Sequence, residues 1–393
     1  MIPAPIAKYL ATPHIKIAAI KLKRVETYIY QTTVNKPVVS SLATINKRVA
    51  LLVRLEDVDG HFGWGEIYAT MPSFGAPHRA QIVHQILTVL LKDQLFEEPS
   101  TCWQLLQKST HPLQIQTGEF GPFSAAIAGI DCALWDLYAR KQKLPLAVCL
   151  GGNLRNLPVY ASGLNPADGP LIVNQSRENG FLSFKQKIGF NTQIDINNLT
   201  AIAANLRPNE SLMVDVNQGW NIEQIQLMGP LLEKFPLRWI EEPLPADSSS
   251  ADWLACKKIL NKPLAGGENL RSDDFKTQAT WLDIVQPDVG KWGGISANWG
   301  IAKLAIEQGK TYCPHWLGSG LGLMASAHLL AAIGGNGLLE IDVNENPLRE
   351  ILAKTLPAVT DGLIKLSTLP GIGVVPNLEL ASPWLTNYQE TIL

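Results

Sequence analysis

The chain has 393 residues, of which 46% are hydrophobic and 17% are charged, and its formal net charge is −2. A chain of this length exceeds what one hydrophobic core usually holds, so we expect two domains. The small net charge provides no basic footprint for nucleic acid or an anionic membrane, and we expect neither as a partner.

Cysteine usage and the absence of long apolar stretches indicate the compartment. The five cysteines are scattered and form no Cys-x-x-Cys pair, which predicts free thiols in a reducing cytoplasm. No stretch reaches 18 apolar residues, and the first ten residues lack the apolar run of a secretory signal. The eleven tryptophans and the high apolar content predict a homo-oligomer, at least a dimer.

The first 140 residues predict an α+β domain. Clusters of β-forming residues at 15–30, 48–56 and 62–67 predict an antiparallel meander, with a turn at residues 57–60. A helix is predicted over residues 79–91. Apolar residues at helical spacing, from Ile127 through Ile130 and Leu134 to Leu137, predict a second helix. Strands followed by helices are typical of an α+β domain.

From residue 144 short apolar runs alternate with amphipathic helices, including helices at 194–206 and 295–307. Eight strands are predicted, at 159–162, 184–187, 212–216, 238–241, 264–267, 284–287, 311–314 and 338–341. This alternation predicts an α/β fold with a parallel sheet, and eight strands predict a (β/α)8-type, TIM-like barrel over residues 141–362. Residues beyond about 363 lack the rhythm, so we expect 363–393 to return and join residues 1–140 as an α+β capping domain.

Seven ionisable residues recur along the chain, each near the end of a short apolar run. They are Lys187, Asp215, Glu241, Glu268, Asp288, His315 and Glu340, separated by steps of 28, 26, 27, 20, 27 and 25 residues. About 25 residues make one strand, one helix and their loops, so one polar group ends each unit. This spacing predicts a ring of functional groups at the mouth of the barrel.

Three of the seven, Asp215, Glu241 and Glu268, are consecutive carboxylates on adjacent predicted strands. Three carboxylates held close together are unfavourable unless a cation compensates them, and oxygen ligands suit Mg²⁺. A single acid at a strand end more often caps the next helix. Three acids in register favour a metal site.

Two lysines, Lys185 and Lys187, lie two residues apart on one predicted strand and therefore share a face. Neighbouring ammonium groups lower each other's pKa, which predicts that Lys187 can act as a base near neutral pH. Two lysines on an exposed sheet edge are the simpler explanation, but a closed barrel has no such edge.

A carboxylate and an imidazole end neighbouring strands in Val-Gln-Pro-Asp288 and Tyr-Cys-Pro-His315. An aspartate beside a histidine fixes its tautomer and raises its basicity, so we predict a catalytic pair. A lone histidine is more often a structural residue of the core or surface than a catalytic one. The neighbouring Asp288 favours a catalytic role for His315. The two predicted bases, Lys187 and His315, come from opposite sides of the ring and would face a substrate between them.

These motifs together resemble the enolase superfamily, and within it the mandelate racemase subgroup. The matching segments are AAIAGIDCALWDLYARKQKLPLAVCLGG, FKQKIG, VDVNQGW, WIEEPL, GGENL, QPDVGKWGG, PHWLGSGLGL and LEIDVNENPLRE. They span about residues 125–350, and the N-terminal meander fits the capping domain of the family. No single segment is specific, but the set is.

The resemblance implies Mg²⁺ on Asp215, Glu241 and Glu268, with Lys187 as a base and Asp288–His315 as a catalytic pair. It also implies that Glu340, the acid of the eighth strand, hydrogen-bonds a developing enolate. We expect Lys185 to stabilise the substrate carboxylate together with the metal. Further substrate contacts are expected from Asn217, Tyr68 and Trp316.

Selectivity in this family comes from two capping loops, expected here at residues 31–37 and 68–77. The expected substrate is a small carboxylate, either a sugar acid that is dehydrated or a 2-hydroxy acid that is racemised. One alternative is a lactonising enzyme of the muconate-cycloisomerase subgroup that uses Lys187 and Lys291. The other is a catalytically silent binding protein on the same fold.

Overall fold

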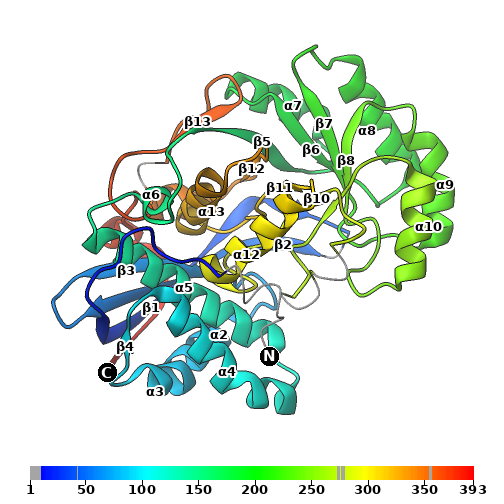
Figure 1. Ribbon diagram of the computed structural model, residues 1–393. Helices are drawn as coiled ribbons and strands as arrows, with labels where there is room; N and C mark the ends of the chain where they lie inside the picture. The colour runs from blue at the N-terminus through cyan, green and yellow to red at the C-terminus, as the bar shows by residue number, and fades with distance from the viewer. Residues whose placement is uncertain (1–9, 42, 272–274, 276–278, 354–355) are drawn as a thin grey trace.

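The computed structural model describes residues 10–41, 43–271, 275, 279–353 and 356–393. Two sheets organise the chain, and Figure 1 shows the first of them, in blue, below the second. The first sheet has the order β14-β1-β2-β3, with β4 paired to β1. Its strands are β1 (Ile20–Val39), β2 (Thr44–Asp57), β3 (Phe62–Ile67), β4 (Leu95–Phe96) and β14 (Leu385–Ile392).

Helices cover this sheet on one side. They are α2 (Gly75–Ile82), a π-helical turn (Val83–Leu87), α3 (Thr88–Leu91), α4 (Pro99–Thr117) and α5 (Phe120–Lys141). Helix α5 packs closely on β3 because two glycines let the backbones meet. A Cβ at Gly65 would lie 2.2 Å from the Gly129 carbonyl oxygen, and one at Gly63 would lie 2.2 Å from that of Ala133. No helix among the described residues is long and apolar enough to span a bilayer.

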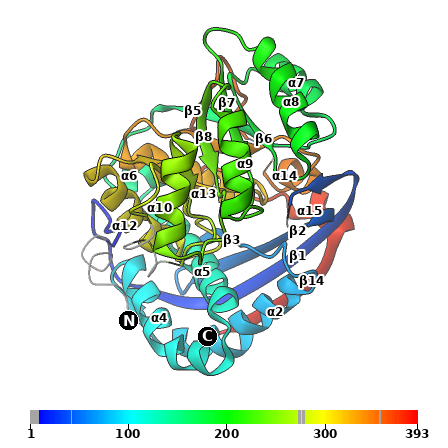
Figure 2. The same ribbon diagram turned by 90° about the vertical axis from the view of Figure 1, so that its right-hand side faces the viewer.

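The expected capping loop at residues 31–37 is wrong, because this segment belongs to β1. Pairing with β2 continues through Thr33↔Lys47, shifts register, and resumes at Val38↔Ile45. The β-branched residues around the Asn-Lys-Pro step favour strand and outweigh its turn signal. The long hairpin reaches the barrel at its tip, where Ser41 Oγ donates to the Val216 carbonyl at 2.7 Å. Figure 2 shows β1 running beneath the barrel beside β14.

The second sheet follows the order β11-β10-β9-β8-β7-β6-β5-β12 and is parallel throughout this path. Its strands are β5 (Asn156–Leu164), β6 (Ser183–Lys187), β7 (Ser211–Asp215), β8 (Leu237–Glu241), β9 (Leu264–Gly266), β10 (Ile284–Val285), β11 (Thr311–Tyr312) and β12 (Leu339–Asp342). The helices that connect and cover them are α6 (Leu146–Cys149), α7 (Gly169–Glu178), α8 (Thr192–Ala204), α9 (Ile222–Leu232), α10 (Ser250–Leu260), α12 (Gly294–Glu307), α13 (Gly320–Ile333) and α14 (Pro347–Leu352).

This sheet curls into a TIM-like barrel, as predicted, although β10 and β11 are shorter than expected. Pro287 and Pro314 lack the N–H that a ladder needs, so regular pairing stops before them. No ladder joins β11 to β12 within the described ranges. Across that seam the Leu338 N–H donates to Cys313 Sγ at 3.3 Å. One buried cluster fills the interior with side chains from both sides of the seam: Tyr160, Met213, Trp239, Ala265, Ile284, Cys313 and Leu338.

The C-terminal tail contributes to both sheets. Strand β13 (Leu363–Lys365) pairs antiparallel with β5 of the barrel, so a capping tail that starts at residue 363 begins too early. Helix α15 (Leu378–Ala381) and a 3₁₀ turn (Ser382–Trp384) follow. Strand β14 then pairs with β1 over seven register positions. We therefore propose that the last strand, rather than the whole of residues 363–393, completes the capping domain.

Candidate active site

Strand register brings three of the predicted site residues into one row. Lys187 pairs with Asp215 across β6 and β7, and Asp215 pairs with Glu241 across β7 and β8. All three end their strands and are buried. Parallel strands of a barrel end on the same rim, which is why residues 54 positions apart in sequence become neighbours.

Each of the three predicted metal ligands pairs with a cationic side chain of the same ring. Asp215 Oδ2 accepts from Lys187 Nζ at 2.6 Å, and Glu268 Oε2 lies 2.6 Å from His315 Nε2. Glu241 Oε1 pairs with Lys185, whose ammonium also lies 3.5 Å from Asp215 Oδ2. The ligand oxygens of the three acids are consequently not all within 4.8 Å of one another.

Negative charge nevertheless exceeds positive charge at this rim. The carboxylates are Asp215, Glu241, Glu242, Glu268, Asp288 and Glu340; the cations are Lys185, Lys187, Lys291 and, when protonated, His315. If all of these groups were ionised, the carboxylates would exceed the cations by two charges, which equals the charge of one divalent cation; without such a cation, burial favours the protonated form of two of the acids. Burial raises the pKa of Glu241 to about 7 even with Lys185 against it. Burial and the nearby Glu268 raise the pKa of Glu242 well above its ordinary value. The donor set therefore fits a hard cation such as Mg²⁺.

The expected low pKa of Lys187 is wrong for this structure. Burial and Lys185 lower the pKa of Lys187, but the Asp215 carboxylate at 2.6 Å outweighs them, and the net direction is upward. Lys187 Nζ also donates to Asn217 Oδ1 at 2.6 Å. Adjacent lysines in sequence predict mutual repulsion, whereas the pairing with an acid from the next strand depends on the tertiary structure.

The predicted Asp–His pair is present in the structure. His315 Nδ1 lies 2.7 Å from Asp288 Oδ2, and a single bridge pairs the two residues across the ends of β10 and β11. Burial lowers the pKa of His315, but Glu268, Glu340 and Asp288 raise it well above the ordinary value. Asp288 thus holds the ring through Nδ1 and leaves Nε2 facing the rim, where Glu268 and Glu340 lie.

Glu340 from β12 completes the ring beside both predicted catalytic groups. Its Oε1 lies 2.7 Å from Lys185 Nζ and accepts a hydrogen bond from Ser162 Oγ at 2.5 Å. Its Oε2 accepts from the backbone N–H of Trp316 at 3.2 Å and lies 3.9 Å from His315 Nε2. Each oxygen of this buried acid therefore accepts at least one hydrogen bond from the protein.

The three expected substrate contacts differ in their surroundings. Asn217 adopts the left-handed backbone region with φ 48° and bonds both Asp215 and Lys187, so it lies within the ring. Tyr68 lies beneath Lys291, whose Nζ is 5.0 Å from the ring centroid. Trp316 is 3% exposed, and its indole N–H donates to the Ser319 carbonyl at 2.7 Å. This burial assigns Trp316 a packing role, and its contact with substrate stays a prediction.

Lys291, the alternative base, is already engaged. Its Nζ donates to Asn269 Oδ1 at 2.5 Å, and Asn269 Nδ2 in turn donates to both oxygens of Glu242. This chain of contacts ties Lys291 to Glu242. Glu268 and Asp288, the two acids that contact His315, also raise the pKa of Lys291, so Lys291 lies on the His315 side of the ring.

Two contacts to Glu241 come from residues that the sequence analysis did not single out. Trp239 Nε1 and Gln286 Nε2 both donate to Glu241 Oε2, at 3.1 and 2.7 Å. Trp239 precedes Glu241 by two residues and Gln286 precedes Asp288 by two, so each shares the inward face of a known site residue. The spacing of two residues along a strand from a predicted site residue is therefore the sequence signal that could identify Trp239 and Gln286.

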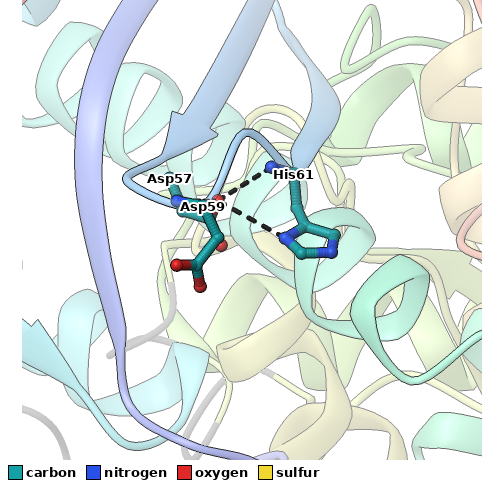
Figure 3. Close-up of side chains that lie close together, drawn as sticks. All are labelled: Asp57, Asp59 and His61. Atoms are coloured by element: carbon teal, nitrogen blue, oxygen red, sulfur yellow. Dashed lines mark hydrogen bonds and ion pairs between the residues drawn. The ribbon is translucent and has the colours of Figure 1, made fainter.

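A separate acidic group lies in the turn between β2 and β3. Among the described residues, one group of three Asp, Glu, His or Cys side chains has its possible metal-ligand atoms within 4.8 Å of one another. It consists of Asp57, Asp59 and His61 (Figure 3). Lys141 Nζ already lies 2.6 Å from Asp57 Oδ2 and 2.9 Å from Asp59 Oδ2. Asp57 Oδ1 accepts hydrogen bonds from the backbone N–H groups of Asp59 and His61. The group is a neutralised turn in the capping domain, and we assign it no metal.

Solved and curated proteins resemble this chain over most of its length. It is 28% identical to the D-galactarolactone cycloisomerase of Agrobacterium fabrum, covering 91% of this chain and 97% of the relative. A mandelate racemase/muconate lactonizing enzyme structure from Bordetella bronchiseptica superimposes with a TM-score of 0.87 at 40% identity, covering 93% and 99% of the two chains. An L-talarate/galactarate dehydratase structure from Salmonella typhimurium, liganded with Mg and L-lyxarohydroxamate, gives 0.82 at 26% identity, covering 96% and 95%.

Two family models divide the chain between them. The mandelate racemase / muconate lactonizing enzyme N-terminal domain matches residues 24–151, and the enolase C-terminal domain-like model matches residues 172–380. Together they cover most of the capping sheet with its helices, and the barrel from β6 to β12, which carries the ring of ionisable residues; β5 and β14 lie outside both matches. The chain belongs to the mandelate racemase / muconate lactonizing enzyme family of the enolase superfamily.

Proposed function

We propose that this protein is an Mg²⁺-dependent enzyme that removes the proton α to the carboxylate of a sugar acid and eliminates the β-hydroxyl as water. The observation that carries the proposal is the ring at the barrel rim. Three strand-end carboxylates lie between a lysine from β6 and a histidine that follows β11 and is held by Asp288. The relatives that act on sugar acids support the substrate class.

Asp215, Glu241 and Glu268 would hold the metal. Mg²⁺ bound there would supply positive charge to the substrate carboxylate, which stabilises the second negative charge that develops as the α-proton leaves. Lys185 lies between Asp215, Glu241 and Glu340 and adds a second cation at the same place. Glu340 would face the developing enolate oxygen.

Lys187 and His315 divide the proton transfers. Asp215 raises the pKa of Lys187 while the two are paired; with Asp215 engaged by a metal, Lys187 would lose that partner, and its neutral form would accept the α-proton from one face of the substrate. His315, held by Asp288 through Nδ1, donates its Nε2 proton to the departing β-hydroxyl, which leaves as water. The enol that remains tautomerises to a 2-keto-3-deoxy acid. The same two groups would racemise a 2-hydroxy acid if no β-hydroxyl were available to leave.

Proton NMR in D₂O tests the proposal with a library of sugar acids and 2-hydroxy acids in the presence of Mg²⁺. The expected result is loss of the α-proton signal and appearance of a 2-keto product from at least one sugar acid. Exchange or inversion confined to 2-hydroxy acids would make the protein a racemase. Metal binding with neither exchange nor product from any acid would support the silent binding protein instead.

A further inference from the structure

The two oxygens of Glu241 face different kinds of partner. Oε1 pairs with the Lys185 ammonium, which also lies 3.5 Å from Asp215. Oε2 accepts two hydrogen bonds from neutral donors, Gln286 Nε2 at 2.7 Å and Trp239 Nε1 at 3.1 Å. Oε1 therefore faces the lysine side of the ring, and Oε2 is bound by donors that lie in the barrel interior.

The two neutral donors are themselves fixed by packing. Trp239 and Gln286 are each 1% exposed. The Trp239 ring meets the Tyr160 ring edge-on, with centroids 5.4 Å apart and planes at 85°. Gln286 Nε2 also lies 3.4 Å from the Tyr160 hydroxyl. Both donors are therefore buried side chains that also contact Tyr160.

Neutral donors orient an acid without cancelling its charge. A glutamate carboxylate turns readily about its terminal torsion, which has a broad and roughly two-fold profile. Two hydrogen bonds to one oxygen select a single orientation, and the neutral donors add no positive charge beside the carboxylate. A lysine or arginine in the same place would compete with a metal for the carboxylate.

We propose that Trp239 and Gln286 are positioning residues that hold Glu241 with Oε1 presented to the metal. The inference rests on the proposed function only in taking Glu241 as a metal ligand. The amide oxygen of Gln286 has no hydrogen-bond partner among the described residues, so its polar contribution passes through Nε2. Residues that orient metal ligands typically contribute 10–100-fold to metal affinity.

The test measures Mn²⁺ affinity of the full-length protein by electron paramagnetic resonance, since carboxylate sites that accept Mg²⁺ also accept Mn²⁺. Gln286→Met keeps the length of the side chain and removes the donor; Trp239→Phe keeps the ring and removes the indole N–H. Each should weaken Mn²⁺ binding by roughly 10–100-fold. Trp253→Phe is the control, because Trp253 is also buried in the barrel, at 5% exposed, and its Nε1 has no hydrogen-bond partner among the described residues.

A further variant distinguishes failure of the positioning inference from failure of the proposed metal site. Glu241→Gln should bind Mn²⁺ far more weakly than the unmodified protein. If it does, but Gln286→Met and Trp239→Phe bind as tightly as the control, the positioning inference is wrong and the proposed metal site stands. If the unmodified protein binds no Mn²⁺, both ideas fail. Circular dichroism checks folding, and because both variants address the same oxygen, either one decides the question if the other does not fold.

Discussion

Replacing His315 with asparagine tests the division of labour between the two bases. The imidazole spans from Asp288, 2.7 Å from Nδ1, to Glu268, 2.6 Å from Nε2. An asparagine side chain is shorter than histidine. Its amide keeps a hydrogen-bond donor for the buried Asp288 carboxylate, but it has no nitrogen at the place of Nε2 and cannot transfer a proton there. Alanine would leave Asp288 without its partner, so asparagine isolates the loss of proton transfer from the loss of structure.

The expected cost is that of one general acid–base group, about 10²- to 10⁴-fold in turnover. This corresponds to about 3–5 kcal/mol of activation free energy. Lys187 lies on another strand and keeps its contacts with Asp215 and Asn217, so proton removal on its face should survive. For a dehydratase, His315→Asn should exchange the α-proton of the substrate with deuterium and form little 2-keto product.

The assay follows both reactions in one proton NMR experiment in D₂O, on the acid that the substrate screen identifies. Lys187→Ala should lose α-proton exchange outright in a dehydratase, and in a racemase each variant should spare the opposite enantiomer. His61→Asn is the control, because His61 is exposed in the β2–β3 turn. Full turnover by His315→Asn would refute the two-base mechanism, and Lys291 would become the group to test.

Three further predictions follow from the metal site, the core and the surface. EDTA should abolish turnover and Mg²⁺ restore it, whereas Asp215→Asn should stay inactive at any Mg²⁺ concentration that restores the unmodified protein; activity in EDTA would contradict the metal assignment. Burial lowers the pKa of His328 from 6.5 to about 4, so the folded state binds fewer protons and loses about 3 kcal/mol of stability as pH falls through that window. Urea midpoints at pH 7 and pH 4 should show a smaller acid loss in His328→Leu than in the unmodified protein, and equal losses would refute this. Light scattering at micromolar concentration should report at least a dimer, and a monomer would contradict the oligomer prediction.

The sequence by itself determined the architecture and the membership of the active-site ring. Apolar runs alternating with helices predicted a parallel sheet, and acids or bases at the ends of those runs had to meet because parallel strands end on one rim. The residue spacing alone therefore predicts that Asp215, Glu241 and His315 lie at the same rim. The sequence predicts a capping loop at residues 31–37, where the structure continues β1, because the turn signal at Asn-Lys-Pro is local and the pairing with β2 that overrides it is not.

The tertiary structure alone decided which groups pair within the ring. A strand period predicts the face on which a side chain lies, but not which neighbour it reaches across the ring. The upward pKa shift of Lys187 depends on an acid 2.6 Å away on the next strand. Trp239 and Gln286 donate to the same oxygen of Glu241, although Gln286 lies 45 positions further along the chain than Glu241. Electrostatics and ligand orientation change over a few ångströms, and only the closed packing of the barrel sets distances on that scale.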